Sequence, residues 1–165
     1  MTLRTHVLHR EQRLAGTPGE VFAFFADASN LEAITPPLLR FTVITPGPIE
    51  MRVGTLIAYR LRVHRAPVSW LTSIQRWDPP RAFVDMQIKG PYALWHHTHG
   101  FAADGQGHTL MTDTVRYAIG YGPLGELAHT AFVRRDVERI FDYRARVIEP
   151  LLGADIERRA RKAAG

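Results

Sequence analysis

Cysteine is absent from the 165 residues, which excludes disulfides, thiolate catalysis and cysteine-ligated zinc or iron–sulfur centres. No apolar run approaches the ~20 residues that cross a bilayer, so no stable membrane insertion is expected. The N-terminal segment has no apolar stretch behind its charges, unlike a secretory signal. Together these absences predict a cytoplasmic protein.

Lysine is also scarce, because only Lys89 and Lys162 are present, and the formal net charge of +5 comes mainly from arginine. A nucleic-acid-binding surface needs basic residues clustered on one face. Here the arginines are spread along the strand-like segments and the last helix, so no nucleic-acid partner is expected. The one short basic run contains Arg158, Arg159, Arg161 and Lys162. It predicts a solvated basic tail over residues 153–165.

The length favours one domain, placed at residues 1–152, and the 45% hydrophobic and 22% charged content is ordinary for a globular chain. Residues 4–14 read as a first strand. Thr17 and Glu20 then form a capping-box pattern that opens a short helix. A second, brief helix follows and must end at the prolines Pro36 and Pro37.

Between Leu39 and Tyr121 the chain reads as six strands, because turn signals recur about every dozen residues. Tight turns between long strands indicate an antiparallel meander. From Pro123 to Pro150 apolar residues recur at steps of three and four, which predicts a helix of about 25 residues. This combination belongs to the α+β class, with the long helix lying across the concave face of a curved sheet.

This order of elements resembles the helix-grip fold of the START, Bet v 1 and polyketide cyclase/dehydrase proteins, the SRPBCC superfamily. The resemblance covers residues 3–152 and is sharpest for a bacterial subgroup of unassigned biochemical role. The matching stretches include TPGEVFAFFADASNLEAITPP, WLTSIQRWDPP and FVDMQIKGPYALWHHTHGF. The resemblance implies a START/Bet v 1-like ligand-binding domain, with a deep cavity between sheet and helix for an apolar or amphipathic small molecule. It does not imply a reaction.

Alternation along the strands predicts which side chains face that cavity, since residues two apart share a face. It points Trp95 and Phe101 inward on one strand, with Met111 and Val115 on the next. In the strand Phe83–Lys89 the apolar residues lie opposite Asp85, so alternation alone argues against an inward Asp85. The register that the resemblance implies is the opposite one, in which Asp85 and Gln87 face the cavity. The polar groups then expected to converge are Asp85, Gln87, His97, His99, Asp113 and Tyr117.

Carboxylates beside imidazoles suit proton transfer near neutral pH, because the acid fixes the tautomer and raises the basicity of the ring. The candidate catalytic residues are therefore His97, His99, Asp85 and Asp113. The same groups could instead anchor a ligand, or satisfy one another as a buried hydrogen-bonded ladder. The candidate ligand-binding residues are Trp70, Thr72, Gln87, Trp95, Phe101, Met111, Tyr117, Phe132 and Phe141.

Three functions remain open on the sequence. The first is binding, for carriage or sensing, of a hydrophobic or amphipathic molecule. The second is a cyclase, dehydratase or hydrolase that uses a His/Asp pair. The third is an interaction module whose interior is filled by its own side chains. The pattern His97-Thr98-His99 is a weak metal signal by itself, so neither a metal nor another cofactor is expected. The expected assembly is a monomer or a weak homodimer.

Overall fold

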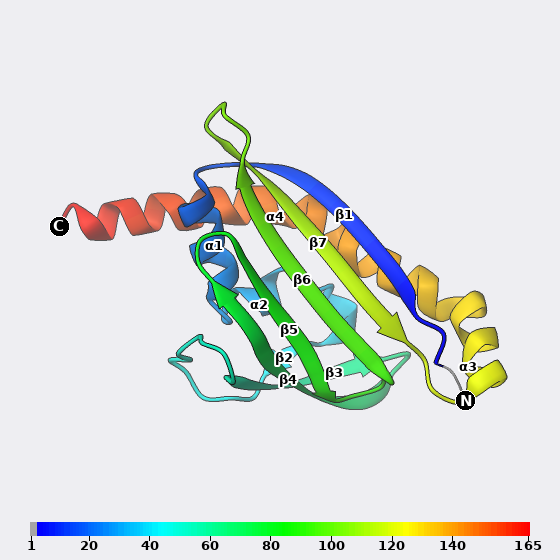
Figure 1. Ribbon diagram of the computed structural model, residues 1–165. Helices are drawn as coiled ribbons and strands as arrows, with labels where there is room; N and C mark the ends of the chain where they lie inside the picture. The colour runs from blue at the N-terminus through cyan, green and yellow to red at the C-terminus, as the bar shows by residue number, and fades with distance from the viewer. Residues whose placement is uncertain (1–2) are drawn as a thin grey trace.

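Seven antiparallel strands form one curved sheet in the order β1-β7-β6-β5-β4-β3-β2 (Figure 1) in the computed structural model, which describes residues 3–165. The strands are β1 (His6–Ala15), β2 (Thr42–Val43), β3 (Leu56–Val63), β4 (Ala66–Asp78), β5 (Ala82–Lys89), β6 (Leu94–Ala103) and β7 (His108–Ala118). The first strand pairs with the last, and β2 lies at the opposite edge. The predicted antiparallel meander and α+β class are confirmed.

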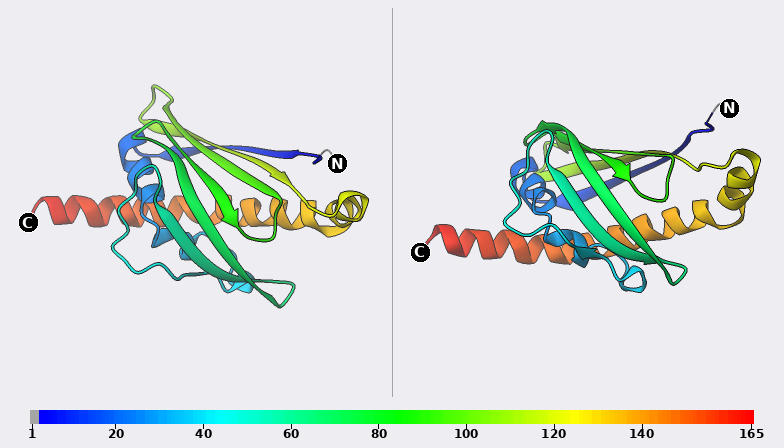
Figure 2. Two further views of the ribbon diagram at one scale, coloured as in Figure 1. Left: turned by 60° about the horizontal axis from the view of Figure 1, so that its bottom comes forward. Right: turned by 90° about the horizontal axis from the view of Figure 1, so that it is seen from below.

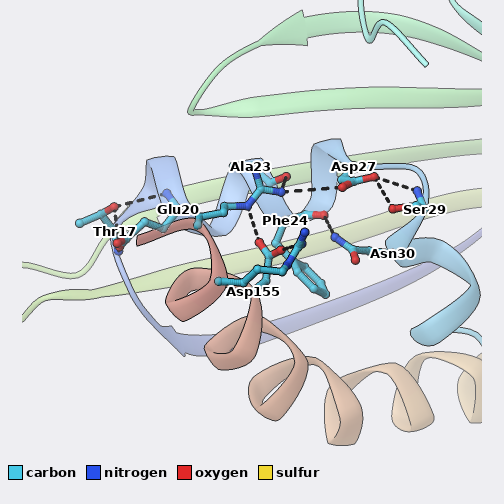
Figure 3. A network of polar contacts seen from close by, with 10 residues as sticks. Thr17, Glu20, Ala23, Phe24, Asp27, Ser29, Asn30 and Asp155 are labelled. Atoms are coloured by element: carbon cyan, nitrogen blue, oxygen red, sulfur yellow. Dashed lines mark hydrogen bonds and ion pairs between the residues drawn. The ribbon is translucent and has the colours of Figure 1, made fainter. Parts of the chain in front are cut away.

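Two short helices follow β1, as predicted: α1 (Pro18–Ala26) and α2 (Asn30–Ala33), with a 3₁₀ turn at Pro37–Leu39. The capping box begins α1, because the backbone N–H of Glu20 donates to Thr17 Oγ1 at 3.3 Å (Figure 3). In return the backbone N–H of Thr17 donates to the Glu20 carboxylate at 2.7 Å. The apolar residues of α1 are buried in the core, where they cover one end of the sheet.

The C-terminal helical segment is longer than predicted. It comprises α3 (Gly122–Ala128), a π-helical turn (His129–Val133) and α4 (Arg134–Ala163). The helix α4 runs along the sheet and continues well beyond Pro150 (Figure 2), so the predicted end at Pro150 is wrong. A proline removes one helical hydrogen bond, but buried contacts beyond it, at Leu152 and Asp155, keep the helix folded.

Arg159, which pairs with Asp155, joins this extension of α4 to α1 (Figure 3). The carboxylate of Asp155 is buried and accepts hydrogen bonds from Arg158 and, at 2.6 Å, from Nε of Arg159. Arg159 also donates to the carbonyl of Ala23 in α1. The basic run is therefore helical, and its first part is docked against the domain.

Two regions of the sheet are covered in different ways. Near α1, the rings and aliphatic chains of Leu14, Phe22, Phe101, Met111, Ile148 and Leu152 form a closed core. Towards β3 and β4 the helix α4 stands away from the sheet and leaves the cavity described below. No helix within residues 3–165 combines the length and apolar character needed to cross a membrane.

Replacement of Ile156 tests whether the extension of α4 belongs to the folded core. Ile156 packs against the closed core, so Ile156→Ala should lower the free energy of unfolding by about 2 kcal/mol. Urea denaturation followed by circular dichroism measures this. The exposed neighbour Glu157 provides the control, and Glu157→Ala should change stability by less than ~0.5 kcal/mol. Equal midpoints for both variants would mean that the segment does not contribute to the core.

Candidate functional site

A cavity of about 790 Å³ lies between the sheet and α4. Its walls are mostly apolar and come from α2, β3–β6, the π-helical turn and α4. They include Ile57, Tyr59, Leu61, Trp70, Ile74, Phe83, Trp95, Ile140 and Phe141. A cavity of this volume and composition is typical of sites that enclose a small organic molecule.

Five of the nine predicted ligand-binding residues line this cavity. They are Trp70, Thr72, Trp95, Phe132 and Phe141. Two others, Phe101 and Met111, point to the same face of the sheet but lie in the closed core, with 5% and 2% of their surface exposed. The prediction that they line the cavity is wrong, because α1 covers the sheet at their end of β6 and β7. Alternation identified the correct face of the sheet, but it did not show whether a residue lies at the cavity end or the closed-core end of its strand.

The remaining two predicted ligand-binding residues are used elsewhere. The amide of Gln87 donates to the carbonyl of Tyr92 at 2.7 Å and accepts from the backbone N–H of Tyr92 at 3.3 Å, which closes the turn between β5 and β6. The hydroxyl of Tyr117 lies 3.0 Å from Nε2 of His129, whose ring stacks on that of His6. Neither Gln87 nor Tyr117 lines the cavity, so both assignments are corrected.

All four predicted catalytic residues meet in one buried cluster on β5, β6 and β7. Strand register brings them together, because Asp85 is paired with His97 and His99 with Asp113. His97, His99 and Asp113 are each at most 7% exposed, and Asp85 is half-buried. Asp85 faces the cavity with the two histidines, so the register implied by the family resemblance is correct for β5 and the argument from alternation was wrong there.

The two imidazoles and two carboxylates alternate around a closed ring, which we call the His–Asp ring. His97 Nε2 is 2.7 Å from Asp113 Oδ1, and His99 Nε2 is 2.9 Å from Asp85 Oδ2. The second nitrogens complete the ring: His97 Nδ1 is 3.6 Å from Asp85 and His99 Nδ1 is 3.1 Å from Asp113. Asp113 lies behind the histidines, whereas His97, His99 and Asp85 border the cavity.

The environment drives the pKa values of the two histidines apart. Burial lowers the pKa of His97, and the neighbouring His99 lowers it further, against the pull of Asp113. For His99 burial acts in the same direction, but the contacts with Asp113 and Asp85 outweigh it and raise the pKa. Burial opposes ionisation of both acids, yet the two imidazoles hold the pKa of Asp85 and of Asp113 below the usual range.

These shifts are in opposite directions, so His99 holds its second proton more tightly than His97 does. Nε2 of His97 is paired with Asp113, and Nε2 of His99 is paired with Asp85. When His97 is neutral and donates through Nε2, the lone pair is on Nδ1, which lies 3.6 Å from Asp85. Titratable pairs whose pKa values are separated in this way can divide the roles of acid and base between them. The site can therefore both give and accept a proton at the surface of an apolar cavity.

Among residues 3–165, two groups of side chains are spaced closely enough to hold a metal ion. One is Asp85, His97 and His99, and the other is His6, Glu126 and His129. In the first group, the Nε2 atoms of both histidines are already engaged by carboxylates. The second group lies outside the cavity lining, and its stacked histidines bond to Glu126 and Tyr117.

Sequence reasoning missed several polar residues of the cavity, among them Tyr59 and Arg144. Burial, followed by the charge of Asp85, raises the pKa of Tyr59, so its hydroxyl stays protonated. Alternation with Ile57 and Leu61 could have identified Tyr59 as inward. Arg144 falls on the buried stripe of α4 between Phe141 and Ile148, and a lone arginine in an apolar helical stripe was the available signal.

Removal of one carboxylate tests the assignment of protons in the His–Asp ring. Asp113→Asn should lower the pKa of His99, because the neutral amide no longer stabilises the imidazolium. A raised pKa gives stability that is present at low pH and is lost as the pH rises through that pKa, so the variant should also lose this part of the pH dependence. Imidazole NMR titration and urea midpoints against pH measure both effects. Asp78→Asn, at a surface ion pair, is the control, and an unshifted His99 in Asp113→Asn would contradict the assignment.

Comparison with known proteins places the fold among solved structures. The aromatase/cyclase Zhui from Streptomyces sp. R1128 matches with a TM-score of 0.71 at 18% identity, over 98% of this chain and 99% of that chain. A point mutant of norcoclaurine synthase from Thalictrum flavum, in complex with a transition-state analogue, matches with a TM-score of 0.68 at 15% identity, over 92% and 96%. TTHA0849 from Thermus thermophilus matches with a TM-score of 0.62 at 17% identity, over 97% and 100%.

These identities are low, so the structural matches establish the Bet v 1-like helix-grip fold alone. No curated protein matches the chain significantly. The sequence does match one protein family over residues 5–150, nearly its whole length. The chain therefore belongs to the family described as polyketide cyclase/dehydrase and lipid transport.

Proposed function

We propose that the protein binds an amphipathic small molecule in the cavity under α4, with the polar end of the molecule against the His–Asp ring. The observation that carries this proposal is the position of the ring, which places buried titratable groups among the aromatic and aliphatic side chains of the sheet wall of the cavity. Apolar walls favour binding by removing hydrocarbon surface from water, while the His–Asp ring fixes orientation. The open volume argues against a module filled by its own side chains.

The aromatic side chains beside the His–Asp ring, on the same face of the sheet, support the same proposal. The ring of Trp70 packs edge-on against Trp95 at 5.4 Å, and its indole N–H donates to Thr72 Oγ1 at 3.0 Å. Both indoles are therefore held in place with their faces available to the cavity. Rigid aromatic walls lose little conformational freedom when a ligand binds, which favours affinity.

Native mass spectrometry of freshly purified protein should show additional mass from a bound organic molecule. The apolar dye N-phenyl-1-naphthylamine provides a defined probe, and saturable fluorescence enhancement is expected. Trp70→Ala should weaken its binding by roughly tenfold, because an aromatic wall of the cavity is lost. Trp77→Ala is the matched control, since Trp77 packs on Phe22 and Phe83 outside the cavity lining. Absence of saturable dye binding to the folded protein would refute the proposal.

A second candidate function is acid–base catalysis on the bound molecule, favoured by the opposite pKa shifts of the two histidines. In this role Nδ1 of neutral His97 accepts a proton from an acidic carbon of the ligand, and His99 donates one to an oxygen. Such groups contribute roughly 10²–10⁴-fold to a rate when they are positioned well. Cyclisation and dehydration both need this pair of proton transfers.

Proton exchange provides a test that does not require the natural substrate. The protein should accelerate deuterium incorporation beside the carbonyl of β-tetralone in D₂O, followed by NMR. His97→Gln should reduce this acceleration by at least roughly tenfold, since an amide cannot accept the proton. His108→Gln, at the hairpin between β6 and β7, should leave it unchanged. Equal acceleration by wild type and His97→Gln would exclude His97 as the base.

A further inference from the structure

Arg144 occupies an unusual position on the inner stripe of α4. The buried residues of this stripe are Val137, Phe141, Ile148 and Leu152, together with Asp155 beyond the cavity, where Arg158 and Arg159 pair with it. Arg144 is half-buried, lines the cavity, and its Nε atom is fully buried without a hydrogen-bond partner. A buried, unpaired N–H of a cation costs free energy, so the charge of this guanidinium is only partly satisfied by the protein and would be stabilised by an acceptor at its accessible N–H groups.

The ring of Phe141 holds the guanidinium in place. The Cζ atom of Arg144 lies 5.0 Å from the centre of that ring, within the range of a cation–π contact. Phe141 itself is 3% exposed and is fixed by packing against β7 and α4. The contact positions the head of Arg144 but satisfies none of its N–H donors.

The charges around the cavity are unbalanced in favour of cations. Each of its three carboxylates is already paired: Asp85 with His99 at 2.9 Å, Asp136 with His64 at 2.6 Å and Asp142 with Arg10 at 3.3 Å. The arginines of the lining are Arg65, Arg139, Arg144 and Arg146. None of the four forms an ion pair with a carboxylate among residues 3–165. Arg65, Arg139 and Arg146 are exposed, which leaves Arg144 as the half-buried cation of the cavity lining that forms no ion pair, although its charge helps to lower the pKa of Asp85.

We propose that the ligand carries an oxyanion, such as a carboxylate, sulfonate or phenolate, which binds the guanidinium of Arg144. This proposal rests on the proposed binding function and narrows the ligand class to acidic amphiphiles. The Nε–H and one terminal N–H of a guanidinium form a planar fork that matches two oxygens of an oxyanion. The anion would accept hydrogen bonds from the guanidinium and balance its charge, while the apolar body of the ligand lies against Trp70 and Trp95 on the cavity wall.

Two dyes that differ by one sulfonate test this proposal separately from cavity binding. They are neutral N-phenyl-1-naphthylamine and anionic 8-anilino-1-naphthalenesulfonate. The wild-type protein should bind the anionic dye more tightly. Arg144→Met keeps most of the side-chain volume, and it should weaken the anionic dye by at least roughly tenfold while changing the neutral dye by less than about threefold. Arg139→Met, at an exposed cavity arginine, is the matched control and should change neither affinity by more than about threefold.

The two dyes give distinguishable failures. If the neutral dye does not bind to folded protein, the proposed binding function itself fails. If the neutral dye binds but Arg144→Met weakens both dyes equally, or neither, the assignment of an anion to Arg144 is overturned and cavity binding stands. Equal losses of the anionic dye in Arg144→Met and Arg139→Met would also overturn it, because general surface charge would then explain the effect. Circular dichroism and the urea midpoint confirm that each variant is folded.

Discussion

Two carboxylates can lie side by side beneath the helix only because two imidazoles alternate with them. Buried ions of one sign repel each other and lose hydration, and the effective cost in proteins is several kcal/mol per ion. In the His–Asp ring each acid contacts both histidines, so the repulsion between the acids is offset. The ring spans β5, β6 and β7, so any change in strand register would separate its members.

The helix α4 presents one continuous stripe to two different surroundings. Its C-terminal half meets α1 and the tightly packed end of the sheet through Ile148 and Leu152. Its N-terminal half meets the cavity through Phe141 and Arg144. Beside β3 and β4 the short helix α2 and the 3₁₀ turn line the cavity without filling it, whereas α1 packs directly on the other end of the sheet. The same helix α4 thus contributes to the closed core at one end and forms a wall of the cavity at the other.

The sequence predicted the order of elements and the inward face of most strands, because turn residues and alternation are local signals. It did not predict which inward residues reach the cavity, since Phe101 and Met111 differ from Trp95 only in their distance from α1. It also placed the end of the long helix at Pro150, because the contacts that carry the helix further are tertiary. Arg144 was not predicted as a cavity residue for a related reason. The spacing of apolar residues shows which side of a helix faces inward, but it does not show whether that side meets a cavity or a closed core. The family resemblance corrected the face of Asp85, which periodicity alone had assigned wrongly.

The His–Asp ring and most of the other side chains that line the cavity come from different parts of the chain. Histidines and acids sit in the middle of a hydrogen-bonded sheet, where backbone pairing holds them rigidly. The side chains that would choose a ligand stand on α4 and on β3 and β4, towards the far edge of the sheet. Substitutions on the helix or near that edge can therefore reshape what the protein accepts without disturbing the ring. The lining of the cavity and the buried ring are thus carried by separate sets of side chains.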